Sequence, residues 1–210
     1  MFSEWSLAVL NMKKIVIASK NEGKIKEIKN FLHGIESDFL TLNDFPDIPG
    51  IVEDGKTFEE NAMKKAKAVY EHTKLTTIAD DSGLEVDYLS GEPGIHSARF
   101  AGDDATDLQN NEKLLELMKD IPMDERKARF KCVIVLYNSL YNNIVFEGKC
   151  SGYIIDEPKG ELGFGYDPLF VPENNTKTFA ELDLVTKNKI SHRGKALSSL
   201  RNYLERVPIS

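Results

Sequence analysis

The stretch TTIADDSGLEVD, residues 76–87, sets the expected fold around it. Its first four residues are apolar or β-branched, which predicts a buried strand. That strand ends on two adjacent carboxylates, Asp80 and Asp81, and the Ser-Gly pair after them predicts a turn. The alternating residues that follow predict a second, half-buried strand. Like charges rarely stand side by side where a buried strand stops, so the pattern raises a chemical question.

Helix and strand patterns alternate before and after this stretch. Residues 13–19 form a short apolar run typical of a buried strand, and residues 23–32 carry apolar side chains at helical spacing. Thr57 and Glu60 have the spacing of a capping box, which predicts the start of another helix. Because strands and helices interleave without a repeat, the order predicts an α/β protein.

The second half of the chain continues this alternation. A second capping-box pattern at residues 106–109 predicts a helix with Leu108, Leu115 and Met118 facing the core. Residues 127–137 and 143–155 read as two strands joined by a polar turn, which makes the sheet mixed.

Two further elements are expected near the C-terminus. Residues 163–172 are predicted to form an irregular aromatic loop. A last helix is expected to begin near Ser191, and its apolar stripe would consist of Leu197, Leu200, Leu204 and Val207.

Length and composition bound the class of protein. The chain has 210 residues, of which 41% are hydrophobic and 29% charged, and this suits one large globular domain or two small lobes. A net charge of −7 argues against a long nucleic-acid footprint. No apolar run is long enough to span a membrane.

The N-terminus and the cysteines predict a location. Residues 1–11 do not fit a secretory signal, because Glu4 stands where a positive charge is expected. We predict that they are an extension without a part in the chemistry and that residues 12–210 form one domain. Cys132 and Cys150 lie in apolar stretches and read as reduced thiols, with a disulfide between them as the alternative. Reduced thiols predict a cytoplasmic protein.

The segment ASKNEGKIKE, residues 18–27, lies where a strand pattern gives way to a helix pattern. Such a junction offers unpaired backbone N–H groups and the positive end of the helix dipole, which suits an anion. Ser19 and Asn21 add short hydrogen-bonding side chains, and Lys24 adds a positive charge. The segment is not a Walker A loop, because it lacks that motif's first glycine and the hydroxyl residue after its lysine. The alternative is an ordinary Asx-capped helix start with a solvated lysine.

Asp80 and Asp81 admit three interpretations. Carboxylates at a strand end can bind Mg²⁺, and close carboxylates raise one pKa, as a general base requires. The third interpretation is an Asp-Ser-Gly turn whose side chains bond to the backbone. Adjacent strand residues point to opposite faces, so only one of the two need serve a site. Glu53, in the preceding acidic loop, offers a further carboxylate.

Basic and aromatic residues gather in two later segments. Residues 187–196, KNKISHRGKA, place several cations at a predicted helix start, where they oppose the dipole and favour an anionic partner. The alternative is a solvated basic face. Residues 163–168, GFGYDP, place Phe164 and Tyr166 among glycines, where exposed rings can stack on a nucleobase. The alternative is a loop whose rings enter the core.

Motifs along nearly the whole chain, from residue 14 to residue 207, resemble the inosine triphosphate pyrophosphatase family. They are S-x-N-x-G-K-x-x-E at 19–27, EDGKTFEENAMKKA at 53–66, ADDSGLEVD at 79–87, PGIHSARFAG at 93–102, GFGYDPLF at 163–170, FAEL at 179–182 and KNKISHRGKAL at 187–197. Each motif alone is weak, and their common order is what makes the resemblance specific.

The resemblance implies a fold and a reaction. The fold would be a long central mixed β-sheet with flanking helices, in two lobes around a substrate cleft. The enzyme would be a Mg²⁺-dependent homodimer that clears aberrant purine nucleoside triphosphates from the nucleotide pool. It would hydrolyse ITP, dITP and XTP to the monophosphate and pyrophosphate.

The resemblance also implies roles for individual residues. Asp81 would be the catalytic acidic residue and a metal ligand, with Glu53 as a second ligand and Ser82 on the substrate. The triphosphate would be held by Ser19, Lys20, Asn21, Glu22, Gly23 and Lys24. The base pocket and its lid would consist of Phe164, Gly165, Tyr166, Asp167, Lys187, His192 and Arg193.

Base selection follows from polarity. A pocket of donors favours the C6 carbonyl of hypoxanthine or xanthine over the amino group of adenine. Two other functions are open: a Maf-type pyrophosphatase for modified pyrimidine or methylated nucleotides, and a nucleotide-binding module without catalysis.

Overall fold

The computed structural model describes residues 13–138 and 141–206. The predicted N-terminal extension and Val207 lie outside these residues. The chain divides into two compact units. The first comprises the chain up to Asp81, Val133–Glu147 and the chain from Ala196 onward, and the second comprises Ser82–Cys132 and Gly148–Lys195.

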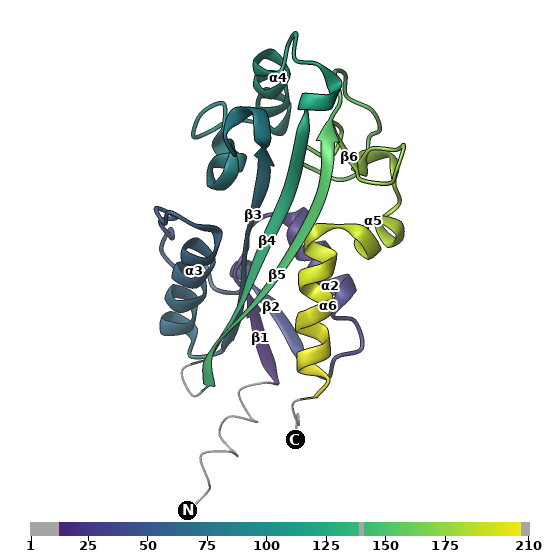
Figure 1. Cartoon of the computed structure of the whole chain (residues 1–210). Coiled ribbons are helices and arrows are strands. Elements are labelled where there is room, and N and C mark those ends of the chain that lie inside the picture. Colours follow the sequence, from purple (N-terminus) through teal and green to yellow (C-terminus); the bar gives the residue numbers. More distant parts are fainter. Residues whose placement is uncertain (1–12, 139–140, 207–210) are drawn as a thin grey trace, which may run out of the picture. The chain divides into compact units, whose positions relative to one another are not determined.

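The strands form one mixed sheet, which confirms the predicted α/β class. They are β1 (Lys14–Ile17), β2 (Asp38–Thr41), β3 (Thr76–Val86), β4 (Lys127–Asn138), β5 (Tyr141–Ile154) and β6 (Phe170–Pro172), in the order β2-β1-β3-β4-β5-β6 (Figure 1). β1 pairs in parallel with β2 and β3, whereas β6 runs antiparallel to β5. β3, β4 and β5 each contribute residues to both units.

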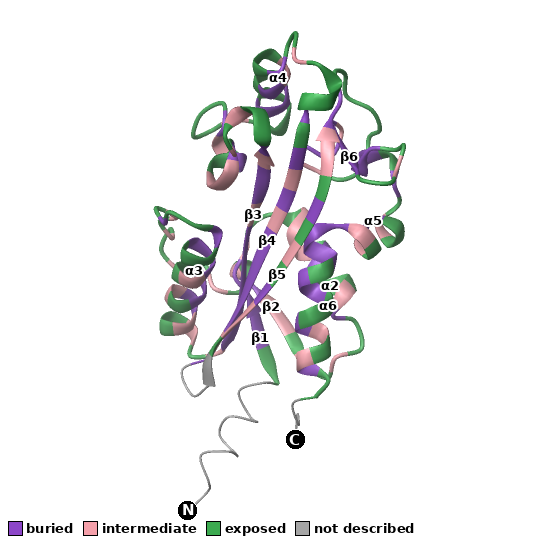
Figure 2. Cartoon of the chain, viewed as in Figure 1, coloured by how far each residue is buried: buried purple, intermediate pink, exposed green. Residues whose placement is uncertain are grey.

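Three helices supply the first unit's apolar packing. α2 (Glu22–Phe31) and α6 (His192–Leu204, from Ala196 onward in this unit) lie on one side of the sheet, and α3 (Phe58–Thr73) lies on the other (Figure 1). Residues of the predicted apolar stripes are buried in all three helices. They are Ile28 within α2 and Leu32 at its C-cap, Phe58, Ala62, Ala66 and Val69 on α3, and Leu197, Leu200 and Leu204 on α6. Figure 2 shows the same faces as buried.

The predicted cap of α3 is confirmed in one half. The side chain of Thr57 accepts a hydrogen bond from the backbone N–H of Glu60, as a capping box requires. The carboxylate of Glu60 accepts from the backbone N–H of Lys56 at 2.7 Å, one residue before the position that a capping box would use. The cap therefore also fixes the loop that leads into the helix.

The second unit has its own apolar core around β3, β4 and β6. The helices of this unit are α4 (Asp107–Leu117), α5 (Leu184–Ile190) and the 3-10 helices η2 (Asp87–Leu89), η3 (Gly94–Arg99), η4 (Met123–Glu125) and η5 (Phe179–Glu181). Phe130 lies at the centre, with ring centroids 4.8 Å from Phe170 and 5.9 Å from Phe179. The Thr106–Gln109 capping box is confirmed in both halves.

The predicted inward face of α4 is wrong at Leu108, which is 67% exposed. Leu108 is the second residue of the helix, and the fully buried residues are Leu114 and Met118. The apolar stripe therefore begins later than the spacing indicated, and the first turn of α4 is left to polar contacts.

The structure corrects three further predictions of secondary structure. β3 is one continuous strand through Asp81 and Ser82, so no turn follows the paired carboxylates. The turn interpretation fails because both carboxylates pair with lysines. The predicted loop of residues 163–172 ends in β6, and α5 precedes the last helix.

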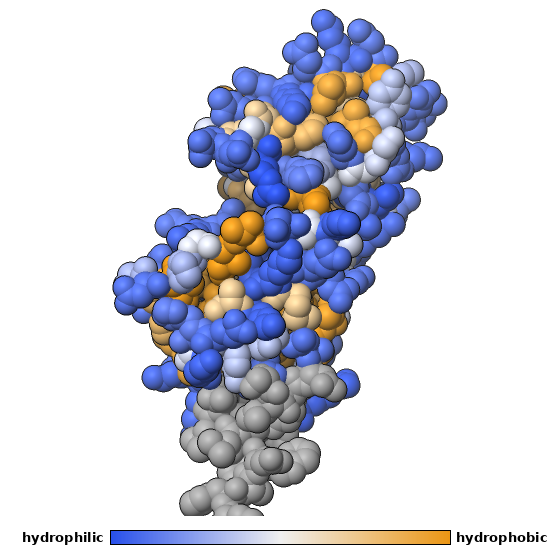
Figure 3. All heavy atoms as spheres, turned by 90° about the vertical axis from the view of Figure 1, so that its left-hand side faces the viewer, coloured by the Kyte–Doolittle hydropathy of each residue, from blue (hydrophilic) through white to orange (hydrophobic). Residues whose placement is uncertain are grey.

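Charged and polar side chains cover most of the face in Figure 3, and apolar side chains appear there in separate small patches. The large apolar residues that are exposed come from different elements, and include Val52, Leu117, Leu162 and Val185. None of the helices that the structure describes has both the length and the apolar composition to cross a membrane.

Candidate active site

The start of α2 carries a lysine that is not solvated. Asn21 caps the helix, and its side-chain oxygen accepts the backbone N–H of Lys24 at 2.9 Å. Ser19 accepts the backbone N–H of Asn21 at 3.2 Å, which orders the turn before the helix. The ammonium of Lys24 lies 3.0 Å from a carboxylate oxygen of Asp80. The alternative interpretation of this segment, an Asx-capped helix start with a solvated lysine, is therefore right about the cap but wrong about the lysine.

A second lysine, Lys65 of α3, lies between two of the predicted carboxylates. Its Nζ is 2.7 Å from Oε2 of Glu53 and 3.9 Å from Oδ1 of Asp81. The first distance is that of a hydrogen-bonded ion pair, and the second is too long for a hydrogen bond. Lys65 is buried on the apolar stripe of α3. Sequence reasoning missed this residue, although a lysine on a buried stripe is itself a signal for an ion pair.

The carboxylates of Asp80 and Asp81 form their closest ion pairs with lysines of two different helices. Asp80 contacts Lys24 of α2, and Asp81 faces Lys65 of α3. α2 and α3 lie on opposite sides of the sheet (Figure 1). This arrangement follows from the alternation of side chains along a strand. The charge of Lys24 also acts on Asp81 and that of Lys65 also acts on Asp80, which explains how like charges can be neighbours within a buried strand.

Burial controls the electrostatics around Asp81. Burial raises the pKa of Asp81, and the positive charges of Lys65 and Lys24 offset only part of this effect. Glu53 and Asp80 raise it further. For Lys65, burial lowers the pKa, but the carboxylates of Asp80, Asp81 and Glu53 outweigh burial and raise it. Lys65 thus stays charged, and Asp81 is a better proton acceptor than an exposed aspartate.

The first turns of α3 hold the loop that carries Glu53. Gly55 donates its backbone N–H to the side-chain oxygen of Asn61 at 2.7 Å, and Asp54 pairs with Lys64 at 2.6 Å. A Cβ on Gly55 would lie 2.6 Å from that Asn61 oxygen, so the loop approaches α3 as closely as only glycine permits. The position of Glu53 is therefore fixed by backbone contacts as well as by its ion pair.

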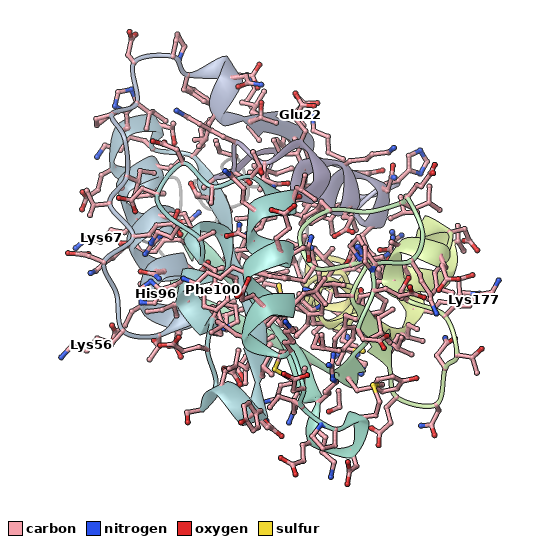
Figure 4. The ribbon with its side chains drawn as sticks, turned by 90° about the horizontal axis from the view of Figure 1, so that it is seen from above. Glu22, Lys56, Lys67, His96, Phe100 and Lys177 are labelled. Atoms are coloured by element: carbon pink, nitrogen blue, oxygen red, sulfur yellow. The ribbon has the colours of Figure 1, made fainter. Side chains whose placement is uncertain are left out.

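Three other residues of the predicted triphosphate-binding segment, Lys20, Glu22 and Gly23, make fewer contacts with the acidic residues. Gly23 is partly buried within α2. Lys20 and Glu22 are exposed, and Figure 4 labels Glu22 at the start of α2. Among the described residues, no hydrogen bond or ion pair joins the side chains of Lys20 and Glu22 to the acidic residues. The structure brings together Lys24, Lys65, Glu53 and the two aspartates instead.

Most of the predicted base-pocket residues gather in the second unit. Arg193 donates to the hydroxyl of Ser82 at 2.7 Å. Lys187 and Asp167 form an ion pair of 2.7 Å, and each side chain is only 4% exposed. The ring of Phe164 lies beside both cations, with its centroid 5.0 Å from Nζ of Lys187 and 5.3 Å from Cζ of Arg193. Ser82 directly follows Asp81 in the sequence.

His192 and Tyr166 belong to the core of the second unit. The ring of His192 stacks on Phe130, with centroids 4.6 Å apart and an angle of 11° between the planes. Tyr166 is 3% exposed and donates its hydroxyl to the carbonyl of Ser97 at 2.9 Å. Burial raises the pKa of Tyr166. The prediction of an exposed ring is wrong for Tyr166, because the Ser97 carbonyl satisfies its hydroxyl, but Phe164 is partly exposed.

The basic segment does not lie at a single helix start. Lys187 and Lys189 are in the last turn of α5, where positive charge is favourable to the helix dipole. His192 and Arg193 begin α6, and the side chain of Ser191 accepts the backbone N–H of Gly194 at 3.0 Å. The prediction that these cations oppose a helix dipole therefore holds only for the residues after Ser191.

The chain is similar to known proteins over most of its length. The model of the Ham1 family matches residues 15–203. A protein of Geobacter sulfurreducens named "dITP/XTP pyrophosphatase" is 48% identical over 193 residues, covering 92% of this chain and 97% of the relative. A protein of Vibrio cholerae with the same name is 50% identical over 197 residues, covering 92% and 98%.

The chain is also similar in fold to solved structures of Ham1 proteins. The Ham1 protein of Staphylococcus aureus superposes with a TM-score of 0.83 at 43% identity, covering 92% of this chain and 98% of the other. A HAM1 protein of Coxiella burnetii gives a TM-score of 0.84 at 41% identity, covering 92% and 99%. The motifs, the fold and the similarity over nearly the full length of both chains lead to one conclusion: this chain belongs to the Ham1 family.

Proposed function

We propose that this chain hydrolyses aberrant purine nucleoside triphosphates, namely ITP, dITP and XTP, to the monophosphate and pyrophosphate. The observation that carries the proposal is the position of Asp81, a buried carboxylate that faces Lys65 and immediately precedes Ser82. The relatives named dITP/XTP pyrophosphatase, which this chain matches over 92% of its length, support the same activity.

The first unit would bind the triphosphate. Lys24 and Lys65 place two positive charges beside Asp80 and Asp81. Such charges stabilise the negative charge that develops on phosphate oxygens during phosphoryl transfer. Ser19 and Asn21 fix the turn before α2, and Lys20, Glu22 and Gly23 complete the proposed binding segment.

Glu53 and Asp81 are placed as two ligands of one magnesium ion would be, because both face the same positive charge. Both carboxylates are directed at a single cation, the ammonium of Lys65. No cluster of three acidic, histidine or cysteine ligands exists among the described residues, so a bound ion would take its other ligands from water and phosphate, as Mg²⁺ commonly does. Bound Mg²⁺ would offset phosphate charge and stabilise the leaving pyrophosphate.

Asp81 would act on the attacking water. Its raised pKa makes it a stronger base than an ordinary aspartate. It would orient the water or accept its proton, while Lys65 would limit the carboxylate's movement.

The second unit would recognise the base. Phe164 offers a partly exposed ring for stacking, and Arg193 and Lys187 are donors beside that ring. His192 is held in the core by Phe130, which fixes the direction of its ring nitrogens. Donors favour the C6 carbonyl of hypoxanthine and xanthine, and they leave the amino group of adenine without an acceptor.

A substrate panel tests the proposal. The protein is incubated with ITP, XTP, ATP and a methylated pyrimidine triphosphate, with and without a chelator, and pyrophosphate is measured. We expect turnover of ITP and XTP at least about 100-fold faster than of ATP, and loss of turnover with the chelator. Preference for the pyrimidine would support a Maf-type enzyme, and tight binding of ITP without product would support a binding module.

Two substitutions locate the chemistry. Asp81→Asn should abolish most activity while the protein stays folded. Glu53→Gln should raise the Mg²⁺ concentration needed for activity, and Glu59→Gln, on an exposed residue in the first turn of α3, is the control for loss of one carboxylate. An Asp81→Asn variant with normal turnover would contradict the assignment.

We also propose a homodimer in the cytoplasm. The resemblance to the family supports the dimer, which light scattering would test. Cys132 and Cys150 are buried and are not joined in a disulfide, which supports a reducing compartment.

A further inference from the structure

α4 contacts Gly165, in the loop that carries Phe164, through both the backbone N–H and the backbone carbonyl of that residue. The backbone N–H of Gly165 donates to Oδ2 of Asp107 at 2.7 Å. The carbonyl oxygen of Gly165 accepts from Nδ2 of Asn111 at 2.9 Å. Asp107 and Asn111 are one helical turn apart, so the two contacts come from the same face of α4. None of the motifs that suggested the family includes α4.

The contacted residue has a backbone conformation that few residues other than glycine adopt. Gly165 has a φ of +61°, a left-handed conformation that favours glycine, and it lies between Phe164 and Tyr166. Phe164 is held on its other side, because its backbone N–H donates to Oδ2 of Asp167 at 2.9 Å. The orientation of the Phe164 ring therefore depends on how both neighbouring peptide groups are held.

α4 is itself anchored firmly enough to serve as a support. Asn110 accepts the backbone N–H of Ala101 at 2.8 Å and donates to the carbonyl of Ala98 at 3.1 Å. Lys113 donates to the carbonyl of Phe100 and lies 4.3 Å from the centroid of its ring. Figure 4 labels Phe100 beside this helix. The segment before α4 is thus tied to the same helix that holds the loop.

A second connection joins the loop to the part of β3 that follows Ser82. Tyr166 donates its hydroxyl to the carbonyl of Ser97, and the hydroxyl of Ser97 accepts the backbone N–H of Leu84 at 2.9 Å. This connection uses buried groups, whereas the contact of Asp107 is exposed. Asp107 is therefore the part of the support that can be changed with the least disturbance to the core, whereas Asn111 is buried.

We propose that Asp107 and Asn111 are positioning residues, which hold the two peptide groups that flank the Cα of Gly165 so that Phe164 is preset for stacking on the purine base. The inference rests on the proposed function and adds two residues to it. Holding a loop in its bound conformation before the ligand arrives removes an ordering cost from binding. The two residues should therefore affect affinity for the base and leave the hydrolytic step nearly unchanged.

Three substitutions test the support. Asn111→Asp keeps the shape of the side chain but turns an oxygen toward the Gly165 carbonyl, so the contact becomes repulsive. Asp107→Leu removes the acceptor, whereas Asp107→Asn keeps an acceptor oxygen and should behave nearly as the natural protein does. Glu112→Gln, on an exposed residue of the same helix, is the control for loss of one negative charge.

The readout separates base recognition from general damage. Calorimetry measures binding of inosine monophosphate, which carries the base, and of inorganic pyrophosphate, which does not. We expect Asn111→Asp and Asp107→Leu to weaken inosine monophosphate binding about tenfold and pyrophosphate binding less than about twofold. The KM for ITP should rise by a similar factor, with kcat within about threefold of the natural value.

The outcomes distinguish this inference from the proposed function. If the unaltered protein neither binds inosine monophosphate nor hydrolyses ITP, the proposed function fails and the inference fails with it. If the unaltered protein does both and the variants match it, only the inference is overturned. Equal weakening of both ligands also overturns it, because that result indicates a general structural role. Should Asp107→Leu not fold, Asn111→Asp and Asp107→Asn still decide the question.

Discussion

Replacing Lys187 by methionine should reveal how strongly a buried charge pair holds the second unit together. Nζ of Lys187 lies 2.7 Å from Oδ2 of Asp167, and each side chain is 4% exposed. Removing one partner of such a pair costs about 3–5 kcal/mol, because the other charge stays buried without compensation. Asp167 keeps the hydrogen bond from the backbone of Phe164, so we expect a loss near the lower end, about 3 kcal/mol.

Urea denaturation measures this loss. With a slope of about 2 kcal/mol per molar urea, a destabilisation of 3 kcal/mol lowers the unfolding midpoint by about 1.5 M. The double variant Lys187→Met, Asp167→Asn carries no buried charge at this pair, and its amide can still accept from Phe164. It should recover at least half of the lost stability. Activity should stay low in both variants, because both residues belong to the proposed base pocket.

Lys189→Met is the matched control. Lys189 is exposed on the same helix, α5, and its loss should change stability by less than about 0.5 kcal/mol. The reasoning is refuted if Lys187→Met costs less than about 1 kcal/mol, or if the double variant is as unstable as the single one.

Three further predictions concern other parts of the chain. Lys24→Met should destabilise the protein by about 3 kcal/mol in urea, because the side chain of Asp80 is 1% exposed and loses a partner at 3.0 Å; an unchanged midpoint would contradict this. Gly55→Ala should lower the rate of ITP hydrolysis at least about tenfold, since its Cβ would lie 2.6 Å from Asn61 and displace the Glu53 loop; a normal rate would show that the loop adapts. Burial raises the pKa of Cys150 to about 11, so its thiol stays protonated near neutral pH. It should react with a disulfide reagent slowly in the native protein at about pH 8, faster as pH approaches 11, and rapidly in urea; rapid native labelling at pH 8 would count against this.

Local rules predicted much of the fold because they depend on neighbouring residues. The capping box at Thr106 forms in full and the one at Thr57 in one half, and the apolar stripe of α3 is buried as its helical period required. The failures have a common cause as well. Asp80 and Asp81 were expected to precede a turn, but ion pairs with lysines from two helices keep β3 extended. Such pairs override the turn preference of Ser and Gly.

The residues of the candidate site also divide into those that sequence reasoning predicted and those that it missed. Sequence reasoning predicted Asp81, Lys24, Glu53 and the basic and aromatic segments as candidates, from their motifs and from the family resemblance, and their roles stay predictions. It did not identify Lys65 as the residue between two carboxylates. Nor did it identify Asp107 as a support for Gly165, which lies 58 residues away in the chain.

The sequence by itself determined the kinds of groups available, the helices that could form and the family to which the chain belongs. Only the tertiary structure decided which carboxylate meets which lysine and which rings are exposed. The physical reason is that charge pairing and burial depend on distances between segments remote in sequence, whereas capping and periodicity depend on residues within about one turn of each other.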